Sequence, residues 1–176
     1  GQGFLHWSAN FDEIHDFEGQ IRRLAGGTGL MADANYFAGT RSEPLGQPKA
    51  GLSPDLDALA AYVTSLRTFD NSPNRASNGA LTAAAVAGRG VFAANGCGSC
   101  HGGTAFSTSG NATLSDVGTV KPTSGSRLGG PHGGIDPPTL RDVWATAPYL
   151  HDGSAPTLAD AERAHRGVSV PDTDLA

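Results

Sequence analysis

The sequence has few cysteines, few charged residues and no long apolar run, and each shortage excludes a class of protein. Cys97 and Cys100 are the only two cysteines in 176 residues, which leaves no third thiol for a zinc site or a competing disulfide. No apolar run approaches the roughly 18–20 residues of a membrane span. The net charge of −5 argues against nucleic acid as a partner, because such partners need Lys and Arg to neutralise phosphate.

The two cysteines belong to Cys97-Gly98-Ser99-Cys100-His101, the C-x-x-C-H signal for attaching a c-type haem. Two thiols three positions apart can add to the two vinyl groups of one porphyrin, and the imidazole that follows can bind the iron. A C-x-x-C pair alone would also suit a redox dithiol or half of a zinc site. The sequence shows no βαβ pattern and no further ligands at zinc spacing, so we expect one covalently bound haem c.

Glycine is abundant, with 25 residues in 176, about twice the usual share. Many of these glycines fall in residues 102–138, where we expect loop and no regular structure. The clear periodic segments are helical. Apolar residues at three- or four-residue steps predict a helix over 10–24, and Ser53 with Pro54 begins a second helix that we expect to end near Thr68. Helices capped by Thr82 and Thr157 are expected on either side of the glycine-rich segment.

These segments predict a mostly α chain in which a partial helical domain precedes a class I cytochrome c-like haem domain with long Gly-rich loops. Residues 171–176 repeat the pattern that begins the helix at Pro54, which suggests a repeated unit. We therefore expect residues 1–70 to be a partial first cytochrome-like domain without its own haem motif and 71–80 to be a linker. Residues 81–176 would be the haem domain, with its final helix truncated in a fragment of a longer protein.

One long motif resembles the C-terminal haem domain of the bacterial di-haem cytochrome c peroxidase family, which includes the tryptophan-tryptophylquinone-forming enzymes. That family carries a run close to P-T-L-R-x-V-x-x-T-x-P-Y-x-H-D-G, followed by a T-L-x-x-A helix. The matching residues are Pro138, Thr139, Leu140, Arg141, Val143, Thr146, Pro148, Tyr149, His151, Asp152, Gly153, Thr157, Leu158 and Ala161. The segment around Trp7 is similar to the family's Trp-containing segment between its two haems.

The resemblance implies a second iron ligand 14 residues after the motif histidine, where this chain has His165 in place of the usual Met. We therefore predict iron ligation by His101 and His165. Two alternatives remain: His165 is an exposed residue at a helix end, or the ligand is Met31, the only methionine. Two imidazoles stabilise ferric iron more than a thioether does, so the predicted potential is low.

The resemblance also implies further site residues. His151, with Tyr149 beside it, would lie near the haem and bond a propionate, although a structural bond to a backbone carbonyl suits the histidine equally. Arg141 suits a propionate because a guanidinium binds a carboxylate bidentately, and a surface salt bridge is the alternative. Carbonyl oxygens of Thr146 and Pro148 would help to bind a calcium ion. The remaining histidines, His6, His15 and His132, are expected to be exposed to solvent.

Two functions of different classes follow. The first is electron transfer through one six-coordinate haem, with a redox partner protein or a neighbouring haem domain as partner. The second makes this chain the electron-relay half of a di-haem peroxidase or oxidoreductase whose catalytic haem lies outside it, so whether the chain alone is an enzyme stays open. A weaker third is a small-ligand sensor, which needs an open coordination site.

Covalent haem attachment normally occurs outside the cytoplasm, so we expect a periplasmic or extracellular protein trimmed of its signal peptide.

Overall fold

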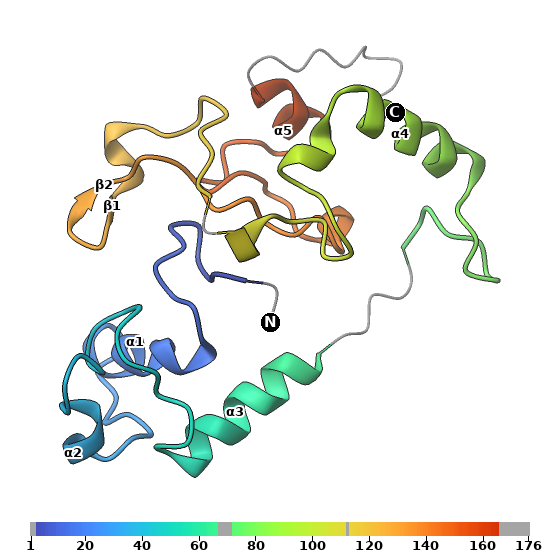
Figure 1. The fold of residues 1–176 in the computed structure, drawn as a ribbon. Helices are drawn as coiled ribbons and strands as arrows, with labels where there is room; N and C mark the ends of the chain where they lie inside the picture. Colours follow the sequence, from blue (N-terminus) through green and yellow to red (C-terminus); the bar gives the residue numbers. More distant parts are fainter. Residues whose placement is uncertain (1–2, 67–71, 112, 166–176) are drawn as a thin grey trace.

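The computed structural model describes residues 3–66, 72–111 and 113–165, which form two lobes joined by the chain that follows α3 (Figure 1). The first lobe contains α1 (Phe17–Arg23), α2 (Asp33–Tyr36) and α3 (Pro54–Ser65). The second contains α4 (Ala83–Ala94), α5 (Leu158–Ala164) and a hairpin of β1 (Ser126–Arg127) and β2 (Gly130–Pro131). Short 3-10 helices lie between these elements.

The prediction of a mostly α fold is wrong. About 36% of the described residues are helical and 8% lie in strands or bridges, so most of the chain is loop. Between α4 and α5 the described residues contain only 3-10 turns of three residues each and the two-residue strands. Glycines with positive φ, among them Gly103, Gly118, Gly125 and Gly129, allow this path, because only glycine adopts such angles without strain.

The helix starts were predicted well, because each depends on a local cap. Ser53 Oγ accepts a hydrogen bond from the Leu56 amide, and Pro54 occupies the first turn of α3. Thr82 and Thr157 cap α4 and α5 in the same way. The helix expected over 10–24 is shorter, since α1 begins at Phe17 after a 3-10 turn at Ile14–Asp16. The expected end near Thr68 and the truncated final helix lie outside the described residues.

The first lobe has a small core of its own. Met31, Tyr36 and Leu56 are almost fully buried there, with Leu52 and Leu59 packed against them. Beside this core, the fully buried Glu18 carboxylate accepts bonds from Arg22 Nε at 2.7 Å and from the amides of Leu30 and Met31. This network fixes the loop between α1 and α2 against α1.

The N-terminal segment, residues 3–9, lies against the second lobe, although it leads directly into the first. The Phe4 amide donates to the Ser109 carbonyl, and Ser109 Oγ donates to the Phe4 carbonyl at 2.9 Å. The Asp136 amide donates to the Trp7 carbonyl at 2.8 Å, and Arg127 Nε donates to the Ser8 carbonyl at 2.7 Å. Backbone atoms of this segment therefore connect the two lobes independently of the chain after α3.

Candidate haem site

The haem motif lies on one tight turn directly after α4. The helix ends at Ala94, the side-chain amide of the following Asn95 donates to the Val91 carbonyl, and Gly96 then takes a left-handed conformation with φ 67°. Cys97–Ser99 form a 3-10 turn, and the His101 amide donates to the Cys97 carbonyl at 2.9 Å. Both thiols are free and half-buried. The turn therefore presents two sulfurs and one imidazole close together, as covalent haem attachment requires.

The His101 ring is oriented by the chain that follows the glycine-rich loop. Its Nδ1 lies 3.0 Å from the Pro138 carbonyl oxygen, which assigns the ring proton to Nδ1 and leaves Nε2 as the atom with a free lone pair. Burial lowers the pKa of His101, and His165 nearby adds to this, while the bond to Pro138 acts in the opposite direction. The ring therefore favours the neutral form, which is the form that binds a metal.

His165 lies beside His101, although the two are far apart in sequence. It follows the last residue of α5, and its Nδ1 lies 2.7 Å from the Ala161 carbonyl oxygen, so its Nε2 is also left available. The two ring centroids are 6.5 Å apart with the planes inclined by 58°. That separation suits one metal ion bound on both sides through bonds of about 2 Å.

Met31 lies elsewhere. Its side chain is 4% exposed in the core of the first lobe, against Tyr36 and Leu56. Its amide donates to Glu18 and its carbonyl accepts from Arg22, so two side chains of α1 fix the backbone of Met31 in the first lobe. The geometry therefore favours His165 over Met31 as the partner of His101.

Several large apolar side chains of the second lobe are exposed. Val86, Phe106 and Trp144 are 59%, 47% and 41% exposed, and α4 contributes no buried residue. Within its described part, the apolar residues that the lobe buries are few and mostly small: Gly134, Ile135, Pro137, Ala155 and Ala161. A porphyrin is a large, flat apolar group, so a haem bound between His101 and His165 would supply the core that the polypeptide lacks. The residues present therefore fit the cofactor.

The three residues expected near a propionate make other bonds in the structure. Arg141 donates from Nε and Nη2 to the Thr104 carbonyl, at 3.1 and 2.5 Å. Tyr149 pairs through its backbone with Ala155, in the tight turn that precedes α5. His151 Nε2 lies 2.8 Å from Ser124 Oγ, and its Nδ1 is buried without a hydrogen-bond partner among the described residues. Contact of these residues with a propionate stays a prediction.

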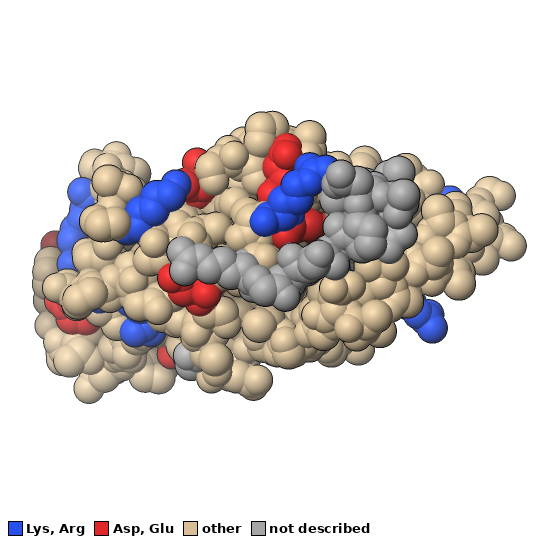
Figure 2. Space-filling view, turned by 90° about the horizontal axis from the view of Figure 1, so that it is seen from above, with Lys and Arg blue, Asp and Glu red and all other residues tan. Residues whose placement is uncertain are grey.

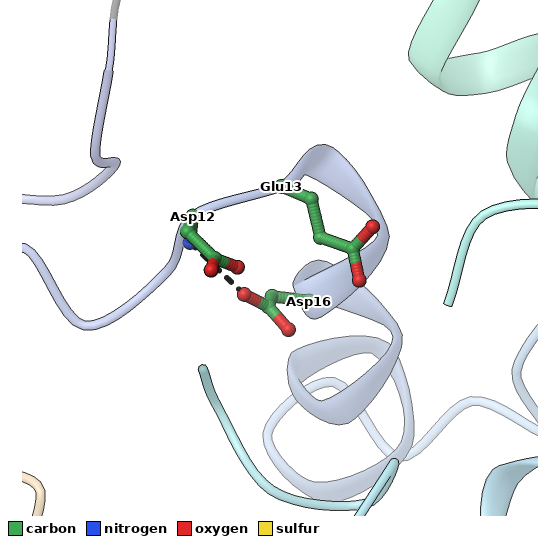
Figure 3. A group of neighbouring side chains, drawn as sticks. All are labelled: Asp12, Glu13 and Asp16. Atoms are coloured by element: carbon green, nitrogen blue, oxygen red, sulfur yellow. Dashed lines mark hydrogen bonds between the residues drawn. The ribbon is translucent and has the colours of Figure 1, made fainter. Parts of the chain in front are cut away.

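The expected calcium ligands lie on exposed chain. Thr146 and Pro148 are both exposed, and the Thr146 hydroxyl donates to the Val143 carbonyl. Among the described residues, the one cluster of acidic groups with metal-ligand spacing is Asp12, Glu13 and Asp16, in the first lobe (Figure 3). Lys49, which is 2% exposed, places its ammonium 2.5 Å from Asp16 and 3.8 Å from Glu13. The Lys49 ammonium therefore occupies the side of the cluster formed by Asp16 and Glu13 and offsets one of its three negative charges.

The prediction that the remaining histidines are exposed is wrong. His15 is 8% exposed, and its Nε2 lies 2.9 Å from Asp57 on α3. The His6 ring packs on Phe11 and Phe17, with centroids 4.4 and 5.1 Å apart. His132 Nδ1 is buried without a hydrogen-bond partner in the described part of the chain. The His15 contact joins segments 42 positions apart, so local sequence gave no signal for it.

Comparison with known proteins gives one family match, which lies between the haem motif and His165. Residues 134–163 match the family described as "RoxA-like, cytochrome c-like". The chain is 32% identical to hydrazine synthase subunit gamma of Kuenenia stuttgartiensis, over 60% of this chain and 39% of that protein. It is 31% identical to the cytochrome c peroxidase Ccp of Escherichia coli (strain K12), over 68% of this chain and 29% of that protein. No solved structure matches significantly.

The family match and both relatives support a cytochrome c peroxidase-like haem family for this chain. The predicted resemblance is confirmed, and a cytochrome c-like domain implies haem c as the cofactor. A role in haem-based electron transfer or oxidoreduction follows. The aligned part of this chain spans less than two fifths of the length of either relative. Among the described residues, no helix has both the length and the apolar character needed to cross a bilayer.

Proposed function

We propose that this chain transfers single electrons through one covalently bound, six-coordinate haem c. The observation that carries the proposal is the pairing of His101 and His165, whose ring centroids are 6.5 Å apart. Both rings engage a backbone carbonyl through Nδ1, which leaves the Nε2 of each able to bind a metal. When bound, the haem supplies an iron that alternates between the ferric and ferrous states.

The residues of the chain have separate roles in this proposal. The thiols of Cys97 and Cys100 would hold the porphyrin through bonds to its vinyl groups, and His101 and His165 would both bind its iron. The carbonyl oxygens of Pro138 and Ala161 hold the two rings and increase their basicity. Together these groups keep the iron inaccessible to water and small ligands, which suits electron transfer.

The surface near the motif bears on the kind of partner. Among residues 76–115 the only charged residue is Arg89, on α4, and the α4 side of the molecule is almost without acidic or basic side chains (Figure 2). We propose that a redox protein or a neighbouring haem domain docks there through uncharged contacts, outside the cytoplasm in the periplasm or beyond. The excess of acidic residues elsewhere makes nucleic acid an unsuitable partner.

A second function is supported by the relatives. One is named a cytochrome c peroxidase and the other a subunit of hydrazine synthase, and both are much longer than the aligned part of this chain. In a longer protein this chain would be the electron-relay half of a di-haem oxidoreductase, with the reacting haem outside residues 1–176. The chain alone would still be an electron carrier.

The optical spectrum of the haem-loaded chain tests the first proposal. Intact mass and a haem stain after denaturation should show one haem, bound covalently. The ferric protein should be low-spin, and hydrogen peroxide should not change its Soret band within minutes. Carbon monoxide should not change the Soret band of the ferrous protein. A high-spin ferric spectrum, or a rapid reaction with peroxide, would mean an open iron site and would favour a catalytic or sensing role for this haem.

A further inference from the structure

One hydroxyl group, where the N-terminal segment meets the second lobe, faces two oxygen atoms but has a single proton. Ser109 Oγ lies 2.9 Å from the Phe4 carbonyl oxygen and 2.6 Å from Oδ2 of Asp136, and both distances fit O–H···O hydrogen bonds. A carbonyl oxygen can only accept, so the Ser109 proton goes to Phe4. Asp136 can then bond Ser109 only by donating, and a carboxyl group donates only when it is protonated.

The surroundings of Asp136 favour the neutral carboxyl group. The residue is 5% exposed, and its second oxygen, Oδ1, is buried without a hydrogen-bond partner among the described residues. An ionised carboxylate would place negative charge on this unpaired oxygen, which costs far more in a buried site than a neutral acid does. Burial accordingly raises the pKa of Asp136, and the bond to Ser109 offsets this only partly.

Charged and titratable groups on the segments around Asp136 are engaged elsewhere. Arg127 donates from Nε and Nη2 to the carbonyls of residues 8 and 9. The ring of His6 packs on two phenylalanines, and Asp116 Oδ1 accepts bonds from amides of its own loop. Within the part of the chain that the structure describes, Asp136 forms no ion pair, so no cation compensates for the charge that ionisation would bring.

We propose that Asp136 binds a proton that controls the contact between the N-terminal segment and the second lobe. With the proton bound, Asp136 donates to Ser109, and Ser109 donates to the Phe4 carbonyl. When the carboxyl group releases the proton to water, its negative charge attracts the Ser109 proton, and the Phe4 carbonyl loses its partner. The segment is therefore held more tightly at low pH, and the contact weakens as the pH rises through the folded-state pKa of Asp136.

This contact adjoins the chain that orients His101. Asp136 is followed by Pro137 and Pro138, and the Pro138 carbonyl oxygen lies 3.0 Å from His101 Nδ1. The Ser107 hydroxyl donates to the Pro137 carbonyl at 2.7 Å and fixes the run between them. The proton on Asp136 is thus two residues away from the group that orients the proposed iron ligand. The proposal itself does not depend on a bound haem.

Infrared spectroscopy of the haem-loaded chain tests the protonation of Asp136. At pH 5 an ordinary aspartate, with a pKa of about 3.9, is mostly ionised. The difference spectrum between the wild-type chain and Asp136→Asn should nevertheless contain the C=O band of a protonated carboxylic acid, and ¹³C labelling of the aspartate carboxyl groups should shift it. Asp160→Asn, which removes an exposed carboxylate on α5, should give carboxylate bands alone. Carboxylate bands alone for Asp136→Asn would overturn the proposal.

Hydrogen–deuterium exchange of residues 3–9, corrected for the intrinsic effect of pH, tests the control of the contact. In the wild-type chain exchange should become about threefold faster or more between pH 5 and pH 8, as the loss of one hydrogen bond implies. In Asp136→Asn it should stay slow, because the amide group donates to Ser109 at every pH. The same pH dependence in both chains would overturn the proposal.

Ser109→Ala gives a second test that does not need the Asp136 variant to fold. This change removes the hydroxyl that joins Asp136 to Phe4, so exchange of residues 3–9 should be fast at both pH values. The wild-type chain should differ from Ser109→Ala at pH 5 and approach it at pH 8. Equal exchange of the two chains at pH 5 would contradict the proposal. Exchange in α3, which lies outside this contact, is the internal reference for global opening.

Discussion

At the scale of single residues, the chain controls its proposed ligands through backbone carbonyls. His101 and His165 each lie within hydrogen-bond distance of a carbonyl oxygen at Nδ1, and these two bonds assign the same tautomer to both rings. The sequence could predict both histidines, one from the C-x-x-C-H motif and one from the family spacing. It could not predict the partners Pro138 and Ala161, because the first is remote and the second depends on where α5 ends.

Replacement of His165 tests iron ligation separately from covalent attachment of the haem. In His165→Ala the thiols are intact, so we expect the haem to remain covalently bound while the iron becomes five-coordinate, high-spin and reactive toward carbon monoxide. Optical spectra of the ferric and ferrous protein measure this. Met31→Leu is the matched control, because Met31 is buried in the other lobe, and its spectrum should stay low-spin. A low-spin spectrum in His165→Ala together with a high-spin spectrum in Met31→Leu would make Met31 the iron ligand.

Glu18 should be the most sensitive acidic residue of the first lobe. It is fully buried and accepts bonds from Arg22 and two amides, so Glu18→Gln leaves the guanidinium without its buried partner. We expect a loss of about 2–4 kcal/mol in the free energy of unfolding. Urea denaturation followed by circular dichroism measures it. Asp160→Asn, in an exposed pair with Arg163, should cost less than about 1 kcal/mol.

At the scale of elements, prediction succeeded where a local signal decides the structure and failed where remote contacts do. The starts of α3, α4 and α5 follow from Ser53, Thr82 and Thr157, each of which accepts a bond from an amide three residues later. The path between α4 and α5 depends on bonds such as Ser107 Oγ to the Pro137 carbonyl. No periodicity encodes such a bond, so the loop expected over 102–138 could be predicted but its path could not. Helix was overpredicted elsewhere, as over 10–24, where α1 begins only at Phe17.

Ser53 gives a test of one element. Its hydroxyl caps α3 and also donates to the Leu30 carbonyl at 2.6 Å, so Ser53→Ala removes the cap and leaves a carbonyl without its partner. We expect a cost of about 1–2 kcal/mol in the free energy of unfolding. Ser65→Ala, at the exposed end of the same helix, should change it by less than about 0.5 kcal/mol. Equal effects in the two variants would argue against the capping role.

At the scale of the whole molecule, two carboxylates should make the first lobe sensitive to acid. Burial raises the pKa of Glu18, but bonds from the Leu30 amide, Arg22 and the Met31 amide outweigh it, and the net pKa is lowered. The Gly51 amide, followed by His15, lowers the pKa of Asp57. A carboxyl group with a lowered folded-state pKa contributes stability above its unfolded pKa of about 4, and this is lost as the pH falls through the folded-state value.

We therefore expect the free energy of unfolding to fall as the pH drops below about 4. Urea titrations at several pH values measure this, and Glu18→Gln should flatten the low-pH part of the curve. Asp136 acts in the opposite direction, because burial raises its pKa and its protonation favours the folded state. A wild-type chain whose stability rises steadily from pH 5 to pH 3 would show that Asp136 and similar groups dominate.

The contact between the N-terminal segment and the second lobe has an evolutionary consequence. Residues 4, 7, 8 and 9 contribute only their main-chain carbonyls and amides to the hydrogen bonds that join them to the second lobe, while Ser109 and Arg127 contribute side chains. Substitutions at the residues that contribute main-chain atoms should accordingly be tolerated, whereas substitutions of Ser109 or Arg127 should be rejected. Across many species, residues 109 and 127 should then change slowly, and the side chains at positions 4, 7 and 8 should vary more than they do.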